Sequence, residues 1–435
     1  MTPAAVRLWG KKIGAVTMED GAGFASFQYD PEFVRSGIEV SPITMPLSNR
    51  VYVFPDLAPR TFRGLPGLLA DSLPDRWGNA LIDAWLSTQG RTPESFNAVE
   101  RLCYTGTRGM GALEYKPATG PRPQRVSMIE INALVELASE VLSQRENLKA
   151  SFASEQRKNA LQDILRVGTS AGGARAKAVV AWNPETNEVR SGQIITGPGF
   201  GYWLLKFDGV SGNKDKEIED PKGYGAIEYA YSLMAKAAGV HMSECRPLDE
   251  NGRRHFMSRR FDRGKGGEKI HMQSLCALAH FDFNQVGAYA YEQAMFIIRQ
   301  LELPMEAIEE QFRRMAFNIV ARNQDDHAKN IAFLMDKEGK WSLAPAFDVT
   351  YSYNPTGTWT STHQMTMNGK RDGFTLEDFK ACARIAQMKR GRAEAIVDEV
   401  RAAVKNWPDY ADQARVMDSW HTHIQRTHRL DIPRK

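Results

Sequence analysis

Residues 323–330 read Asn-Gln-Asp-Asp-His-Ala-Lys-Asn, and Asp348 follows eighteen residues after Asn330. The stretch contains an Asp, an Asn five residues later, and a second Asp beyond a short apolar segment. Phosphoryl transfer needs this set, because one carboxylate accepts the proton of the attacking hydroxyl while an amide oxygen and a carboxylate hold Mg²⁺ against the nucleotide phosphates. Mg²⁺ fits these side chains, since it prefers oxygen ligands and takes only one or two carboxylates beside phosphate and water.

Apolar segments on both sides place these residues in a loop. Residues 315–321 predict the end of a helix and residues 331–335 a strand, followed by a turn at 336–340 and a returning segment at 341–347. A single Asp or Asn in a loop is more often a turn former or a helix cap, but three around one hairpin favour a site. His327 is equally well explained as a support for the loop. Zinc is disfavoured because no Cys or second His lies at ligand spacing.

A run of small residues lies upstream, at 167–180. Small residues let backbone N–H groups approach phosphate oxygens closely, as glycine-rich loops do. The run is not a Walker A loop, because Ala174 and not Lys follows Gly173. A flexible hairpin turn explains it equally well.

Lys206 is the one lysine in the apolar strand predicted at 201–208. Strand alternation places it on the same face as Leu204 and Tyr202, where burial is costly without an anion such as nucleotide phosphate. The alternative is an edge-strand lysine that reaches solvent. Glu228 opens an amphipathic helix and is a candidate partner for Lys206. The resulting order of Gly-rich loop, strand Lys, helix Glu, catalytic Asp, Asn and metal Asp is that of protein kinases.

With these residues in view, the chain resembles the HipA family of serine/threonine-protein kinase toxins from bacterial toxin–antitoxin modules, over nearly its whole length. The resemblance implies an α+β, two-lobed protein-kinase-like fold, similar to the phosphoinositide kinases, with a strand-rich N-terminal subdomain and a mostly helical C-terminal lobe. The motifs that carry it are L-P-D within 69–78, G-x-G-A-L at 109–113, R-F-D-R at 260–263, D-x-H-x-K-N at 325–330 and A-P-x-x-D at 344–348.

The resemblance also implies roles for individual residues, with ATP and Mg²⁺ as cofactors. Asp325 is the expected proton acceptor, and its neighbour Asp326 is the residue to rule out. Asn330 and Asp348 are the expected Mg²⁺ ligands. The other expected ATP contacts are Gly172, Gly173, Ala174, Arg175, Ala176 and Lys177 in the loop, Lys206 at the phosphates, Arg259, Arg260 and Phe261 at the adenine hinge, and His327 and Lys329.

Ser170 matches the serine that the family autophosphorylates. A phosphate there adds roughly two negative charges to a loop that should hold ATP phosphates, so we expect self-inactivation. Two departures from the family leave roles open. Arg175-Ala176 stands where Gln-Glu or Gln-Pro is common, which leaves the role of Lys177 unsettled, and Arg259 stands where Glu is common at the hinge.

The length of 435 residues allows two or three domains. Three prolines within 116–123 predict a linker there. We therefore expect a strand-rich N-terminal subdomain at 1–120, a small kinase lobe with the Gly-rich loop at 124–265, and a helical large lobe with the catalytic loop at 266–435. The predicted strands are 6–18, 24–29 and 51–54, and the predicted helices are 65–85, 129–142, 288–300, 304–321, 376–385 and 392–406.

Composition is that of an ordinary globular protein, with 42% hydrophobic and 25% charged residues and a net charge of +4. The four cysteines have no C-x-x-C spacing, which favours a reducing cytoplasm over a disulfide framework. The N-terminus does not read as a signal peptide, and no apolar stretch approaches the ~20 residues that span a bilayer. We expect a cytoplasmic protein without membrane contact.

The resemblance implies a helix-turn-helix antitoxin partner (HipB-like) that binds operator DNA. Basic residues at 389–392, at Arg401 and Lys405, and at 426–435 are candidates for phosphate contacts, although solvated helix faces explain them as well. The leading interpretation is a kinase toxin that phosphorylates a translation component such as an aminoacyl-tRNA synthetase. The alternatives are a catalytically idle corepressor that acts with the antitoxin on DNA, and a lipid or small-molecule kinase, which the lack of a membrane-binding helix disfavours.

Overall fold

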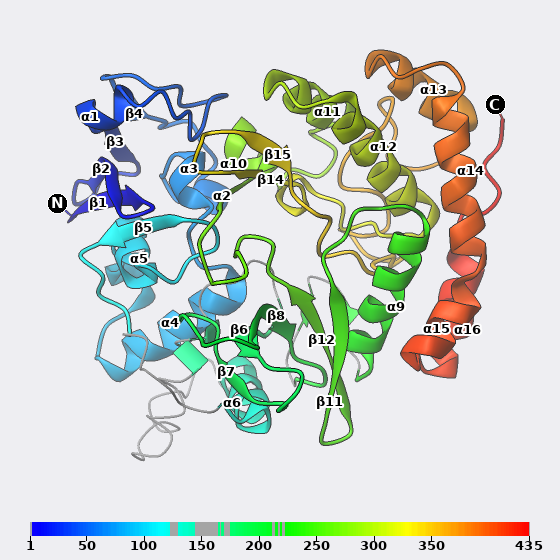
Figure 1. Cartoon of the computed structure of the whole chain (residues 1–435), viewed down its shortest axis with the longest axis horizontal. Helices are drawn as coiled ribbons and strands as arrows, with labels where there is room; N and C mark the ends of the chain where they lie inside the picture. Colours follow the sequence, from blue (N-terminus) through cyan, green and yellow to red (C-terminus); the bar gives the residue numbers. More distant parts are fainter. Residues whose placement is uncertain are drawn as a thin grey trace.

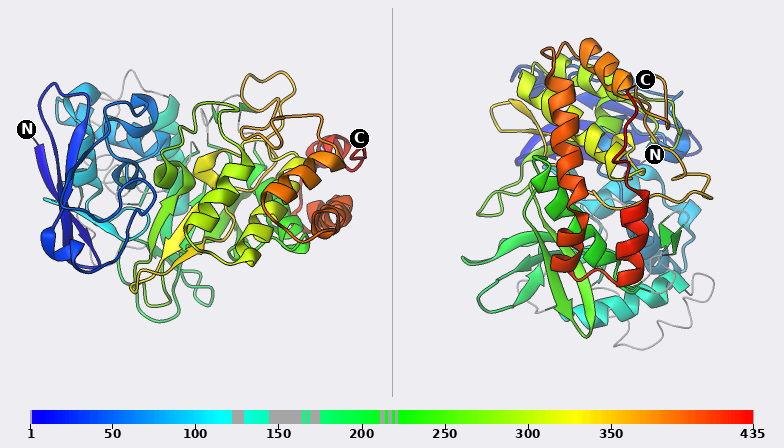
Figure 2. Two further views of the ribbon diagram at one scale, coloured as in Figure 1. Left: turned by 90° about the horizontal axis from the view of Figure 1, so that it is seen from above. Right: turned by 90° about the vertical axis from the view of Figure 1, so that its right-hand side faces the viewer.

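The computed structural model of the chain describes residues 2–121, 129–143, 164–165, 167–168, 175–210, 214–215, 218–219 and 222–434. The N-terminal side is rich in strands and the C-terminal side is mostly helical (Figure 1). The two termini lie at opposite ends of the long axis (Figure 2). This arrangement confirms the predicted α+β fold.

The N-terminal sheet is antiparallel, with strand order β4-β3-β2-β1-β5. The prediction of one strand over 6–18 is wrong, because the chain reverses at Trp9 and Gly10, whose φ angles are 48° and 82°. Glycine accepts this left-handed conformation without cost, so a hairpin replaces the single strand. The strands are β1 (Thr2–Leu8), β2 (Lys11–Met18), β3 (Ala25–Tyr29), β4 (Val51–Val53) and β5 (Leu113–Lys116).

Short helices cover this sheet and lead toward the second one. The predicted helix over 65–85 is wrong in extent, because the chain breaks before Asp75, which begins a new helix. Its Oδ1 accepts a hydrogen bond from the N–H of Gly78 at 2.6 Å, and Pro74 directly before it favours an extended connection. The helices are α1 (Pro31–Val34), α2 (Pro59–Phe62), α3 (Gly67–Ala70), α4 (Arg76–Thr88), the 3₁₀ turn η1 (Pro93–Ser95) and α5 (Ala98–Thr105).

The second sheet has the order β11-β12-β8-β6-β7, and helix α9 packs against it. Its core includes Val180 and Leu205 from the strands, Val135 from α6, and Trp77 and Leu81 from α4. Helix α4 therefore packs on the second sheet although it belongs to the N-terminal part. The elements are α6 (Ile131–Ser143), β6 (Lys177–Trp182), β7 (Val189–Ser191), β8 (Gly201–Lys206), β9 (Lys214–Asp215), β10 (Ile218–Glu219), α9 (Tyr224–Ala237), β11 (Cys245–Glu250) and β12 (Arg253–Arg259).

The C-terminal part combines a small sheet, β13-β14-β15, with a layer of helices. The helix, strand, turn and returning strand predicted around the 323–330 loop are present as α12, β14 and β15. The elements are β13 (His271–Ser274), α10 (Leu275–Ala279), α11 (Tyr291–Gln300), α12 (Met305–Val320), the 3₁₀ turn η2 (Ala328–Asn330), β14 (Ala332–Met335), β15 (Trp341–Leu343), α13 (Leu376–Ile385), α14 (Arg392–Lys405), α15 (Trp407–Ala414) and α16 (Asp418–Thr427).

Among the described residues, no helix combines the length and the apolar character that crossing a membrane requires. The four cysteines, all among the described residues, are buried and free.

Candidate active site

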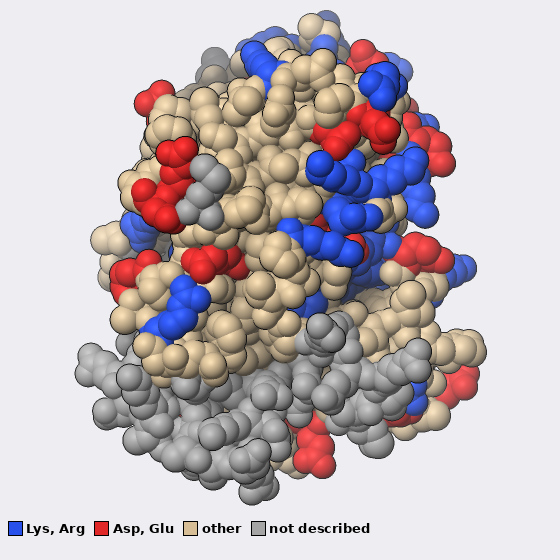
Figure 3. Space-filling model, turned by 90° about the vertical axis from the view of Figure 1, so that its left-hand side faces the viewer, with Lys and Arg blue, Asp and Glu red and all other residues tan. Residues whose placement is uncertain are grey.

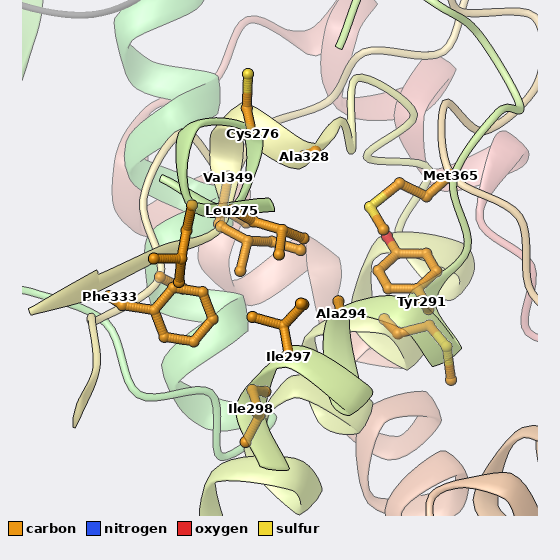
Figure 4. Packing of buried hydrophobic residues seen from close by; sticks show 14 of the residues in the cluster. Leu275, Cys276, Tyr291, Ala294, Ile297, Ile298, Ala328, Phe333, Val349 and Met365 are labelled. Carbon is orange, nitrogen blue, oxygen red and sulfur yellow. The ribbon is translucent and has the colours of Figure 1, made fainter. Parts of the chain in front are cut away.

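The 323–330 loop packs against the hydrophobic core. Ala328 within the loop and Val349 beside Asp348 are both buried, in the same cluster as Leu275 and Phe333 (Figure 4). Such close-packed interiors resist small displacements. The loop and the segment that carries Asp348 are therefore held against one common core.

Hydrogen bonds also fix the loop. The hydroxyl of Ser352 accepts the backbone N–H groups of Gln324 and Asp325, at 2.9 and 3.0 Å. The side-chain amide of Asn330 donates to the carbonyl oxygen of Asp325 at 2.9 Å. Because the nitrogen of this amide makes that bond, its oxygen is the atom left for a cation.

The two adjacent aspartates have different surroundings. Asp325 lines a large cavity, and its side chain is 18% exposed. Asp326 is buried, and its carboxylate accepts hydrogen bonds from the hydroxyl of Tyr291 and the N–H of Gln364 and contacts His363. Burial raises the pKa of Asp326, but His363 and the hydrogen bonds lower it by more. This carboxylate is therefore ionised and binds groups in the interior.

Lys206, Glu228 and Asp348 meet at the floor of the cavity. The ammonium group of Lys206 donates to one carboxylate oxygen of Glu228 and to one of Asp348. Burial lowers the pKa of Lys206, but the two carboxylates raise it by more, so the group is held as a cation. Burial raises the pKa of Asp348, but Lys206 and Lys177 lower it well below its usual range. The structure thus brings the strand lysine, the helix glutamate and the third loop acid together.

The donors near this point suit a hard cation. Asp348 offers an ionised carboxylate and Asn330 an amide oxygen, and both line the cavity. Within the described part of the chain, no group of three or more His, Cys, Asp or Glu side chains is placed to hold a metal. One carboxylate and one amide match Mg²⁺, which keeps several waters and phosphate oxygens, better than they match zinc.

The cavity has a volume of about 810 Å³, and its walls come both from residues 60–110 and from residues 141–350. Arg60 and Arg63 come from the first range, and Asp325, Asn330 and Asp348 from the second. Cavities of this size hold ligands as large as a nucleotide. One pocket therefore contains the candidate base, the candidate metal ligands and Lys206.

The three predicted hinge residues all line the cavity, but their surroundings differ. Phe261 lines the cavity, and its ring lies 5.6 Å from that of Phe347, another lining residue. Arg259 is exposed and pairs with Glu244 at 3.2 Å. Arg260 is buried and binds Asp262 through two nitrogens, at 2.9 and 2.6 Å.

Arg260 nevertheless keeps one donor. Its Nη1 is buried without a hydrogen-bond partner among the described residues, and the residue lines the cavity. A buried donor without a partner costs free energy that a nucleotide acceptor would recover.

The predicted phosphate loop is placed only in part. Ser170, Gly172, Gly173 and Ala174 lie outside the described residues. The guanidinium of Arg175 lies over the ring of Tyr224, with 3.4 Å from its carbon to the ring centre. The carbonyl of Ala176 accepts the N–H of Phe207 at 3.1 Å, which joins the end of the loop to the sheet. Lys177, the first residue of β6, is buried and lines the cavity.

His327 and Lys329 lie within the loop. Nε2 of His327 lies 3.7 Å from Oδ1 of Asp325, and its ring packs at 5.1 Å from that of Phe283. The ammonium of Lys329 lies 5.3 Å from the centre of the same Phe283 ring. Both line the cavity beside Asp325.

Sequence reasoning missed two contacts of the candidate base. The indole N–H of Trp359 donates to Oδ1 of Asp325 at 2.7 Å, and Ser352 binds the backbone of the loop, as described above. Both residues follow Asp348 in a segment without helix or strand, at 34 and 27 residues from Asp325. Local residue spacing does not predict such contacts, because they depend on how this segment folds back onto the 323–330 loop.

Comparison with known proteins places the chain in a family. Residues 4–116 match the HipA N-terminal domain, and residues 169–407, more than half of the chain, match the HipA-like C-terminal domain. This chain belongs to the HipA family. HipA of Shewanella oneidensis MR-1, solved with HipB and its operator DNA, superposes with a TM-score of 0.67 over 97% of this chain and 95% of that one. Identity with that HipA is 15%, so the match shows the fold.

Two further matches are partial. A Haemophilus influenzae protein named "Putative kinase" is 31% identical over 101 residues, which span 21% of this chain and 29% of that protein. The Helicobacter pylori proinflammatory kinase CtkA covers 52% of this chain with a TM-score of 0.33 and 12% identity.

Proposed function

We propose that this HipA family member is an ATP- and Mg²⁺-dependent serine/threonine-protein kinase and the toxin of a toxin–antitoxin module. The observation that carries the proposal is the convergence of Lys206, Glu228, Asp325, Asn330 and Asp348 in one cavity. These residues come from one strand, one helix and two loops. A fold that no longer bound nucleotide would not need to hold five such side chains together.

Each side chain has a task in the proposed reaction. Asp325 accepts the proton of the acceptor hydroxyl, whose oxygen bonds to the γ-phosphorus of ATP while the bond to the β,γ-bridging oxygen breaks and ADP leaves. Lys206, oriented by Glu228, holds the nucleotide phosphates. Asn330 and Asp348 would hold Mg²⁺, which neutralises charge on the phosphates when bound. The indole of Trp359 orients the carboxylate of Asp325.

The test is intact-mass and peptide mass spectrometry after incubation with MgATP, with Asp325→Asn treated in parallel. We expect phosphate on Ser170 in the protein without substitutions and none in Asp325→Asn. Phosphate on neither protein, together with measured ATP binding, would favour the idle corepressor. Lack of ATP binding by the unmodified protein would end the kinase proposal.

The proposed partners follow from the family and from the complex of its Shewanella member with HipB and operator DNA. We propose a helix-turn-helix antitoxin, operator DNA bound through that complex, and a substrate from the translation apparatus such as an aminoacyl-tRNA synthetase. Incubating the active kinase with a cell extract and labelled ATP, with Asp325→Asn as the control, identifies the substrate by the labelled band that the variant lacks.

A direct DNA contact by this chain has two candidate surfaces. Of the C-terminal basic residues, Arg392 pairs with Glu309 at 2.8 Å and Arg401 donates to the carbonyl of Leu430 at 2.7 Å, so part of their charge is used internally. On the face seen from the N-terminal side, Lys and Arg side chains gather in one group at mid-height (Figure 3). Clusters of this kind bind phosphates without reading sequence.

A further inference from the structure

A second lysine faces the cavity beside Lys206. Lys177 on β6 lies directly opposite Lys206 on β8 in an antiparallel ladder. Opposite residues of such a pair project to the same face of the sheet. The side chain of Lys177 is 2% exposed, and burial lowers its pKa. A buried ammonium at this position needs a negative partner.

That partner comes from the N-terminal part of the chain. Nζ of Lys177 lies 3.4 Å from Oδ2 of Asp75, whose side chain is 4% exposed. The indole N–H of Trp77 donates to the carbonyl oxygen of Lys177 at 2.9 Å. The first turn of α4 therefore contacts both the backbone and the ammonium group of the first residue of β6.

Asp75 is the Asp of the L-P-D motif, for which the proposed reaction has no use. Its Oδ1 caps α4 by accepting the N–H of Gly78, so only Oδ2 faces the lysine. The 3.4 Å separation is longer than the roughly 2.7–2.9 Å of a charge-assisted hydrogen bond. The ammonium group of Lys177 therefore lies near the carboxylate of Asp75 but does not form a short hydrogen bond with it.

Asp75 and Glu228 occupy equivalent positions around the two lysines. Glu228 reaches Lys206 from helix α9, and Asp75 reaches Lys177 from helix α4, while all four side chains line one cavity. Burial raises the pKa of Asp75 by more than Lys177 lowers it, which leaves the pKa at about 6, so the carboxylate is mostly ionised at neutral pH.

We infer that Asp75 is a positioning residue of the nucleotide site, which holds the ammonium group of Lys177 toward the phosphates of ATP. The N-terminal part of the chain thereby supplies a member of the ATP site. This inference rests on the proposed kinase function, and it assigns a role to Lys177 that the sequence left open.

The capping role of Asp75 must be separated from its contact with Lys177. Asp75→Asn keeps a capping oxygen and removes the charge, since Asn and Asp cap helices about equally well. Asp30→Asn is the matched control, because Asp30 caps α1 through Glu32 and pairs with Lys12 at 3.1 Å on the surface. A loss that follows from capping or from general stability would appear in both variants.

The experiment measures MgATP affinity by calorimetry and the KM and kcat of autophosphorylation. The proteins are the unmodified chain, Asp30→Asn, Asp75→Asn, Lys177→Met and the double variant Asp75→Asn/Lys177→Met. We expect Asp75→Asn to weaken ATP binding about tenfold and to raise KM more than it lowers kcat, which is the scale of coupling between contacting residues. In the Lys177→Met background, Asp75→Asn should add nothing.

Two results would overturn the inference. One is unchanged ATP affinity in Asp75→Asn, and the other is an equal further loss when Asp75→Asn is added to Lys177→Met. The double variant and Lys177→Met both lack the ammonium group of residue 177, so neither contains a buried ammonium that has lost its partner. Their comparison is therefore valid even where Asp75→Asn alone folds poorly. Absence of ATP binding by the unmodified protein would overturn the proposed function as well, which distinguishes the two failures.

Discussion

At the scale of single residues, the neighbours Asp325 and Asp326 show how environment separates two identical side chains. The carboxylate of Asp325 meets the cavity and one indole N–H, whereas that of Asp326 is enclosed by Tyr291, His363 and Gln364. An acid that must exchange a proton with a ligand has to reach the ligand. Asp326 instead joins the loop to the interior.

Substitution by Asn should therefore affect a different property at each position, the rate of phosphate transfer at Asp325 and the stability at Asp326. Asp325→Asn should lower the rate of phosphate transfer about a hundredfold or more, the usual contribution of a positioned base, with little change in stability. Asp326→Asn should lower the free energy of unfolding by about 3 kcal/mol, because three buried partners lose a charged acceptor. Urea unfolding and initial rates of the folded proteins check both. Loss of transfer in Asp326→Asn alone would exchange the two roles.

Trp359 is the second residue-scale prediction. Trp359→Phe keeps an aromatic ring and removes the N–H that donates to Oδ1 of Asp325. A hydrogen bond to a charged group is worth about 1.5 kcal/mol or more, so kcat should fall roughly tenfold. Steady-state kinetics at saturating ATP measure this. An unchanged kcat would show that other contacts suffice to orient the carboxylate.

At the scale of elements, the position of helix α9 determines whether Glu228 reaches Lys206. Gly225 lies in the first turn of α9, and a Cβ there would come within 2.1 Å of the carbonyl oxygen of Arg254 on β12. The missing side chain is therefore what lets the helix lie close on the strand. Glu228 follows one turn later, on the same helix.

Gly225→Ala should push α9 away from β12. We expect a loss of about 1–3 kcal/mol in stability, the usual cost of overpacking, together with weaker ATP binding through the disturbed Lys206–Glu228 pair. Gly197→Ala is the control, because a Cβ at Gly197 meets nothing within 4 Å. Unfolding and ATP titrations of both variants make the comparison, and equal behaviour of the two would contradict the close-approach argument.

At the scale of the molecule, a buried ionic cluster joins residues 109–111, near the N-terminal sheet, to residues 260–263, which follow β12. Asp262 accepts two bonds from Arg260 and one from Arg263, and it also accepts the N–H of Gly111 at 2.7 Å. Arg263 in turn donates to the carbonyl oxygen of Gly109 at 3.2 Å. The R-F-D-R and G-x-G-A-L motifs are therefore the two sides of one contact.

Asp262→Asn should cost about 3–5 kcal/mol, because it leaves two buried guanidinium groups without their carboxylate. Asp249→Asn is the control: Asp249 binds Arg254 with the same two-pronged geometry, at 2.7 and 2.6 Å, but its side chain is 56% exposed. An exposed pair of this kind contributes less than about 1 kcal/mol. Urea unfolding of the two variants should differ accordingly, and similar losses would refute the role of burial.

Buried histidine makes stability depend on pH. Burial lowers the pKa of His271 to about 4, while its Nε2 contacts the carbonyl of Val40 at 3.2 Å. An unfolded histidine titrates near about 6.5, so between those values the unfolded chain binds the extra proton and stability falls as pH falls. The lowered pKa values of Asp326 and Asp262 act only at lower pH.

His271→Gln should therefore make the chain less sensitive to acid. The loss of unfolding free energy between pH 7.5 and pH 5 should be smaller in the variant by about 2 kcal/mol, from the share of one proton over this range. Urea unfolding at the two pH values measures it. A difference of the same size in both proteins would show that His271 is protonated in the folded state.

Much of the site was predictable from residue types and spacing. Asp325, Asn330 and Asp348 were placed around one hairpin, and Lys206 and Glu228 were proposed as partners, because apolar periodicity shows where strands and helices begin and end. The breaks at Trp9–Gly10 and at Pro74–Asp75 were missed because the spacing of apolar residues resumes beyond each of them. The domain limits at 120, 124 and 265 stay a prediction.

Residue types at short spacing sufficed to predict the kind of chemistry, to indicate the family and to give the order of most elements. The folded chain was needed to show which of two adjacent acids faces the cavity, that Trp359 contacts Asp325, and that Asp75 reaches Lys177 across 102 positions of the chain. Such contacts depend on how separate elements pack, and packing is settled by the summed burial of many side chains in shared cores.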